Sequence, residues 1–123
     1  MGSLPPLFFA LVLSVVDGDT LHVRITLWLD QTVETSIRIA GIDTPEMHGA
    51  CPRERKLAIE AKAALVRILP EKSVIMVRRI APDKYFGRVV ADIFTLTNLD
   101  IAGHLLRIGL AHSYDGKKKR GWC

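Results

Sequence analysis

The chain has 123 residues, of which 49% are hydrophobic and 24% are charged. This length suits one domain and is too short for two, and the composition is that of a globular protein rather than a disordered one. Lysine and arginine number 17 against 13 aspartates and glutamates, which gives a net charge of +4. Such a surplus suits a polyanionic partner, either a nucleic acid or an acidic membrane surface.

The chain begins with an apolar run over residues 7–16. The run is about half as long as a bilayer-spanning helix, no basic segment precedes it, and no small-residue cleavage site follows it. We therefore expect a buried strand and no membrane partner. Residues 1–6 are expected to be a leader or an expression remnant, because Met-Gly-Ser is a common recombinant start.

The next two elements are also predicted to be strands. Residues 20–29 alternate between apolar and polar side chains, which predicts a half-buried strand. Its inner face would carry Leu21, Val23, Ile25 and Leu27. Residues 33–40 are rich in β-branched side chains and predict a third strand, and residues 41–52 form a loop.

A helix is predicted to begin at Pro52, because the missing N–H of proline costs nothing in a first helical turn. Apolar residues recur at helical spacing as far as Ile68, and Pro70 ends the pattern. The charged residues between them, Glu54 included, are assigned to the exposed face.

Two further strands are predicted over residues 73–80 and 88–96, followed by a short helix over residues 100–108. Three strands, a helix, two strands and a second helix are the order of an OB-fold, so we expect an α+β, mostly β, five-stranded barrel. The domain would span residues 7–116. The basic tail, residues 117–123, is expected to be irregular and solvated. Its basic side chains could also add non-specific contacts to the phosphates of a nucleic acid.

Cys51 and Cys123 are the two cysteines of the chain. They lack the close spacing of a zinc site. A disulfide between them would stabilise the fold by roughly 3–4 kcal/mol in the entropic model and would indicate an exported protein, otherwise of unknown location. Two unrelated thiols are the alternative.

Two acidic segments stand out, Asp17-Gly18-Asp19-Thr20 and Asp43-Thr44-Pro45-Glu46. In a meander, the turn after the first strand and the end of the third strand lie at the same end of the sheet, so Asp19 and Asp43 can converge. Converging carboxylates repel unless a cation, a proton or an arginine neutralises them, and hard divalent cations prefer such oxygen ligands. Taken singly, each segment could also be a simple turn.

Two arginines favour a functional interpretation. Arg38 lies within an apolar strand, where a charge is costly without a partner, and Arg88 opens the fifth strand. Guanidinium groups beside a metal and a water-orienting carboxylate form the set of groups that phosphoryl transfer requires. An exposed arginine or a structural ion pair is the alternative for each.

These segments, together with Phe86-Gly87-Arg88 and residues 106–111, resemble the staphylococcal (micrococcal) nuclease or thermonuclease family in order and spacing. The resemblance covers about residues 12–114. It implies a calcium-dependent endonuclease that acts on DNA and RNA, preferably single-stranded, and that leaves 3′-phosphate and 5′-hydroxyl ends. It also implies a protein that works as a monomer.

The resemblance assigns roles to individual residues. Calcium would be held by the side chains of Asp19 and Asp43 and the backbone carbonyl of Thr44. Glu46 would orient or deprotonate the attacking water, and Arg38 and Arg88 would bind the scissile phosphate. Substrate contacts would come from Lys84, Tyr85 and Tyr114.

The chain departs from the family pattern at three places. Phe86 is an extra residue between Tyr85 and Gly87, the loop after Glu46 is shorter and holds Cys51, and the chain stops before the family's third helix. An altered loop at residues 85–87 leaves open the alternative of a non-catalytic OB module that binds single-stranded nucleic acid by charge and stacking.

Overall fold

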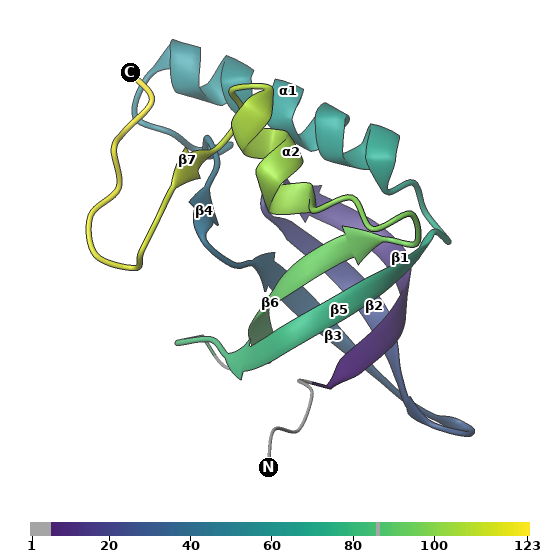
Figure 1. Ribbon diagram of the computed structural model, residues 1–123. Helices are drawn as coiled ribbons and strands as arrows, with labels where there is room; N and C mark the ends of the chain where they lie inside the picture. Colours follow the sequence, from purple (N-terminus) through teal and green to yellow (C-terminus); the bar gives the residue numbers. More distant parts are fainter. Residues whose placement is uncertain (1–5, 86) are drawn as a thin grey trace.

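A computed structural model describes residues 6–85 and 87–123 of the chain, so the expectations for residues 1–5 and for Phe86 lie outside the described residues. Five strands close into a barrel in the order β1-β2-β3-β6-β5 (Figure 1). All neighbouring strands are antiparallel except β3 and β6, which run parallel. The predicted OB-type barrel is confirmed. The barrel strands are β1 (Leu7–Asp17), β2 (Thr20–Trp28), β3 (Gln31–Ile39), β5 (Val74–Pro82) and β6 (Arg88–Thr95).

Two helices, α1 (Pro52–Ile68) and α2 (Ile101–Arg107), lie over one end of the barrel (Figure 1). Each begins where the sequence predicts, after Cys51 and Asp100 respectively, although the Asp100 side chain makes no capping hydrogen bond. Helix α1 buries one face against the barrel core through Ala61, Ala64 and Leu65. No helix in the described part of the chain is long and apolar enough to cross a membrane.

The predicted inner face of β2 is correct for three residues and wrong for the fourth. Leu21, Val23 and Ile25 are buried, but Leu27 is 50% exposed. The ladder between β1 and β2 starts at the pair Phe9 and Thr26, so Leu27 lies beyond the end of this ladder. The tip of the β2–β3 hairpin consequently extends out of the barrel wall (Figure 1).

A small second sheet lies outside the barrel and was not predicted. It pairs β4 (Ile42–Asp43) with β7 (His112–Ser113) in antiparallel register. The backbone N–H of Tyr114 extends the contact by donating to the carbonyl of Gly41 at 2.9 Å. The segment that follows α2 is thereby attached to the exit of β3, within residues 41–52 that the sequence suggested to be a loop.

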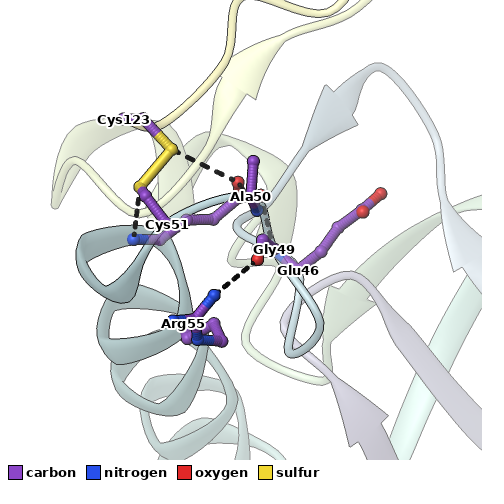
Figure 2. The surroundings of a disulfide bond; sticks show 7 residues. Glu46, Gly49, Ala50, Cys51, Arg55 and Cys123 are labelled. Carbon is purple, nitrogen blue, oxygen red and sulfur yellow. Dashed lines mark hydrogen bonds between the residues drawn. A yellow bond between two sulfur atoms is a disulfide. The ribbon is translucent and has the colours of Figure 1, made fainter.

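The two cysteines form a disulfide, with their Cα atoms 5.9 Å apart (Figure 2). The irregular tail therefore returns to the beginning of α1, where Cys51 is also the N-cap residue and its Sγ accepts a hydrogen bond from the N–H of Glu54 (Figures 1 and 2). Of the two alternatives for the cysteines, the disulfide is the correct one.

The disulfide closes a separation of 72 residues, for which the entropic model gives a stabilisation of about 4 kcal/mol. We expect the double variant Cys51→Ser/Cys123→Ser to unfold at a Tm about 10–20 °C lower, measured by calorimetry. Serine keeps a capping oxygen at the start of α1, so the loss reports the cross-link. Reductant should lower the Tm of the wild type and leave that of the double variant unchanged; insensitivity of both proteins contradicts the assignment.

Candidate active site

One cavity of about 550 Å³ opens where the β1–β2 turn, the exit of β3, the β5–β6 connection and the tail meet. The structure brings all nine residues that the sequence singled out to the wall of this cavity. Asp19 and Asp43 thus lie at the same end of the barrel, as the meander argument requires. The nine are Asp19, Arg38, Asp43, Thr44, Glu46, Lys84, Tyr85, Arg88 and Tyr114.

Close packing at Gly18 brings the β1–β2 turn against Thr44. A Cβ atom at Gly18 would lie 2.8 Å from the Cβ of Ala61 on α1 and 3.0 Å from the Oγ1 of Thr44, which leaves no room for a side chain. The carbonyl of Asp19 also accepts a hydrogen bond from the N–H of Ile39 at 2.8 Å. The turn is therefore fixed to both the end of β3 and the segment that follows it.

Negative charge accumulates in this corner of the cavity. Asp19 and Asp43 are only 9% and 4% exposed. Burial, together with the hydrogen bond and the negative charge of Asp19, raises the pKa of Asp17 to about 6. A place where one carboxylate raises the pKa of its neighbour is a place where a cation is favoured.

Arg38 faces the carboxylates, which explains why a charge is tolerated within β3. Its Nη2 lies 3.7 Å from the Oδ2 of Asp19 and donates a hydrogen bond to the carbonyl of Ile42 at 3.1 Å. The guanidinium group also lies 5.4 Å from the ring centroid of Tyr114. These contacts hold the arginine at the cavity wall, with its side chain only 16% exposed.

Arg88 is held by a carboxylate that the sequence interpretation missed. Its Nε donates to the Oδ2 of Asp83, and its guanidinium carbon lies 4.8 Å from the ring centroid of Tyr85. The ammonium of Lys84 lies 5.3 Å from the centroid of the same ring. Asp83 takes the Nε edge of the guanidinium, which is distinct from the two terminal nitrogens that can fork around a phosphate.

The basic tail is irregular and mostly exposed, as expected, but two of its side chains, those of Lys119 and Trp122, reach the carboxylates of the site, which was not predicted. The Nζ of Lys119 lies 3.2 Å from the Oε1 of Glu46 and 3.5 Å from the Oδ1 of Asp43. Trp122 donates from Nε1 to the other oxygen of Asp43 at 3.4 Å and stacks on the ring of His112 at 3.7 Å. The disulfide at Cys123 holds the end of the tail in place.

The electrostatics of Lys119 reflect this placement. Burial by itself lowers the pKa of Lys119, but the hydrogen bond to Glu46 and the charges of Asp43 and Glu46 outweigh burial and raise the pKa above its usual value. The ammonium therefore stays charged at neutral pH and neutralises part of the carboxylate charge at the cavity.

The oxygen donors present fit a hard divalent cation. The side chains of Asp19 and Asp43 and the carbonyl of Thr44 belong to residues of one cavity wall, and such cations complete their shells with water and phosphate oxygens. Within residues 6–85 and 87–123, no group of three or more His, Cys, Asp or Glu side chains is placed so that those side chains alone could hold a metal ion.

The fold and the cavity define a small OB-fold protein with a site of carboxylates and guanidinium groups at one end of its barrel. The family model described as staphylococcal nuclease homologue matches residues 36–121, more than half of the chain. The chain belongs to this family.

A curated relative carries the similarity further along the chain. The protein named Endonuclease Htp3, from Saprolegnia parasitica (strain CBS 223.65), is 31% identical over 116 residues, which cover 84% of this chain and 54% of the relative. The chain thus spans about half the length of that relative.

The Asp83–Arg88 pair predicts a pH dependence of stability. Burial raises the pKa of Asp83, but the hydrogen bond from Arg88, a backbone hydrogen bond at Lys84 and the charges of Arg88 and Arg38 outweigh it and hold the pKa below its usual value. Because the folded-state pKa is lowered, the stabilisation is present above about pH 4, the ordinary pKa of an aspartate, and is lost as the pH falls through the lowered value.

We expect Asp83→Asn to lower the Tm near pH 7 and to converge with the wild type toward pH 3, measured by calorimetry across this range. Asp30→Asn, at an exposed position of the β2–β3 hairpin, is the control and should follow the wild-type curve. Curves for Asp83→Asn and wild type that stay parallel across the range would show that the pair contributes nothing through its charge.

Proposed function

We propose that this protein is a calcium-dependent endonuclease that hydrolyses phosphodiester bonds in DNA and RNA, with single strands preferred, and leaves 3′-phosphate and 5′-hydroxyl ends. The observation that carries the proposal is the shared cavity, which two carboxylates, two guanidinium groups and Glu46 line from three separate segments of the chain. A phosphodiesterase needs this combination, because charge on phosphorus-bound oxygens must be neutralised while water attacks.

In the proposal, calcium is held by Asp19 and Asp43 through their side chains and by Thr44 through its carbonyl. The bound ion supplies positive charge that polarises the scissile phosphate. The ammonium of Lys119 lies against the same carboxylate, at 3.5 Å from Asp43 Oδ1. Two cations repel when they share one carboxylate, so Lys119 is expected to leave Asp43 when the metal binds.

Arg38 and Arg88 are the proposed phosphate ligands. A guanidinium group matches phosphate oxygens with two parallel N–H donors, and the match strengthens as negative charge grows in the transition state. Protein groups hold both arginines in place. Arg38 contacts Asp19 and the carbonyl of Ile42, and Arg88 pairs with Asp83. Groups that are fixed before the substrate arrives need little reorganisation during the reaction.

Glu46 is the proposed water-activating residue. Its side chain is 61% exposed, so its carboxylate is accessible to water at the cavity. In the proposed step the water oxygen bonds to phosphorus, a water proton passes to Glu46, and the bond from phosphorus to the 5′ oxygen breaks. The departing 5′ oxygen takes up a proton from solvent water at the cavity and ends as a hydroxyl group, and the phosphate stays on the 3′ side.

The proposed substrate contacts come from Lys84, Tyr85 and Tyr114 at the cavity wall. The lysine supplies charge for the phosphate backbone, and the tyrosine rings can stack on bases that are free of a duplex, which favours single strands. The net charge of +4 supports binding of either nucleic acid.

The proposed enzyme acts as a monomer, with its domain at residues 7–116 and the tail, residues 117–123, anchored to it. The disulfide favours an oxidising compartment, so we propose that the protein is exported.

The proposed activity is tested with purified protein and end-labelled single-stranded DNA and RNA oligonucleotides, in calcium and in excess chelator. We expect cleavage with calcium, loss of cleavage with chelator, and products with 3′-phosphate and 5′-hydroxyl ends. Retention of intact oligonucleotide on the protein, with or without calcium, would instead identify a non-catalytic binding module.

The proposed arginine clamp predicts large kinetic effects. Arg38→Ala and Arg88→Ala should each lower kcat/KM by about 10³–10⁵-fold, as loss of a transition-state arginine does in phosphoryl-transfer enzymes. Arg67→Ala, at an exposed position in the last turn of α1, is the control and should cleave like the wild type. Near-normal turnover in either clamp variant would remove that arginine from the mechanism.

A further inference from the structure

The loop that carries Glu46 is built around a buried carboxylate. Glu54 is only 9% exposed, although its place in the helix pattern puts it among charged surface residues. Its Oε2 accepts a hydrogen bond from the backbone N–H of Glu46 at 3.1 Å, and its Oε1 accepts one from the N–H of Ala50 at 3.2 Å. One side chain from the first turn of α1 therefore ties both ends of the loop, residues 46–50.

The loop also has the composition needed to enclose that carboxylate. A Cβ atom at position 49 would lie 2.4 Å from the Cδ and 2.7 Å from the Oε1 of Glu54, so only glycine leaves room for the side chain beneath the loop. The carbonyl of Gly49 accepts a hydrogen bond from Arg55 at 2.9 Å, and its N–H donates to the carbonyl of Glu46 at 2.9 Å (Figure 2). Glu54 and Arg55, which are neighbours in α1, thus both bind the loop: Glu54 through the N–H groups of Glu46 and Ala50, and Arg55 through the carbonyl of Gly49.

The side chain of Glu46 takes no part in the hydrogen bonds within the loop, and its Oε1 instead accepts one from Lys119 of the tail. Figure 2 shows this side chain projecting from the loop on the side away from the disulfide. The backbone N–H of Glu46 is bonded to Glu54, whereas its carboxylate lies at the wall of the cavity. A shift of the loop would therefore move the carboxylate relative to Asp43 and the arginines without disturbing those residues directly.

We propose that Glu54 is a positioning residue for Glu46: its buried carboxylate fixes the backbone from which Glu46 reaches the attacking water. This inference rests on the proposed function, because it assigns a purpose to the placement of Glu46. Glu54 touches neither the metal ligands Asp19 and Asp43 nor the phosphate ligands. In the proposal it acts on the reaction through the loop; its Oε1 also lies 4.0 Å from the Sγ of Cys123.

Replacement of Glu54 by glutamine tests this role with little change in volume. One of the two oxygens becomes an amide NH₂, which cannot accept a hydrogen bond from Glu46 or Ala50. The NH₂ group would then face a backbone N–H, and two donors cannot bond to each other. The loop then loses one of its two anchors while the helix packing is kept. Because misplacement by about 1 Å can cost a factor of about 100 in rate, we expect kcat to fall by roughly 10- to 100-fold.

The experiment is a double-mutant cycle in kcat, measured at saturating calcium and oligonucleotide for wild type, Glu54→Gln, Glu46→Gln and the double variant. If Glu54 acts through Glu46, Glu54→Gln slows the wild type but adds nothing once Glu46 is already glutamine. KM and the calcium Kd from titration calorimetry should stay at wild-type values in Glu54→Gln. Glu60→Gln, at an exposed position of the same helix, is the matched control and should leave all these quantities unchanged.

The inference is overturned if Glu54→Gln lowers kcat by the same factor in both backgrounds, or if it leaves kcat unchanged. A wild-type kcat in Glu46→Gln would instead refute the proposed function of Glu46, and the two failures are thus distinguishable. If Glu54→Gln fails to fold, Gly49→Ala supports the same cycle, because its methyl group displaces the intact carboxylate. Circular dichroism establishes folding for each variant.

Discussion

The mutual repulsion of carboxylates gathered at one end of the barrel is the constraint on which the rest of the site depends. Asp17, Asp19 and Asp43 line one cavity wall, and burial together with the hydrogen bond and charge of Asp19 raises the pKa of Asp17 to about 6. Two basic side chains neutralise part of this charge: Arg38 lies beside Asp19, and Lys119 lies beside Asp43. In the proposed function, Asp19 and Asp43 would hold a calcium ion, which would supply the positive charge that Lys119 places beside Asp43 in this structure.

The barrel supplies the positions at which these charges meet. Strand pairing sets Thr20 opposite Arg38, so the acidic turn and the first arginine are fixed by backbone register rather than by side-chain contacts alone. The small β4–β7 sheet carries Asp43 and directs the chain after α2 toward the cavity. The Cys51–Cys123 disulfide then returns the tail to the start of α1, so one covalent bond supports both the loop of Glu46 and the placement of Lys119.

The fold was predictable because its signals are local. Alternation in β2, the proline at the start of α1 and the turn residues at 17–20 each act over a few residues, and the convergence of Asp19 and Asp43 follows from the meander. Glu54 could not be found in this way, since its helical position resembles an exposed one and its partners are backbone N–H groups. Lys119 lies on a tail that a covalent link across 72 residues ties to the start of α1, and pairing of β4 with β7 involves strands too short to show periodicity.

The most direct measurement is a crystal structure with calcium and a non-hydrolysable dinucleotide, in which anomalous scattering locates the metal. The account predicts an ion bound by oxygens of Asp19, Asp43 and Thr44, with Arg38 and Arg88 on the scissile phosphate and Lys119 withdrawn from Asp43. A metal bound elsewhere, or a phosphate that neither arginine contacts, would contradict the account.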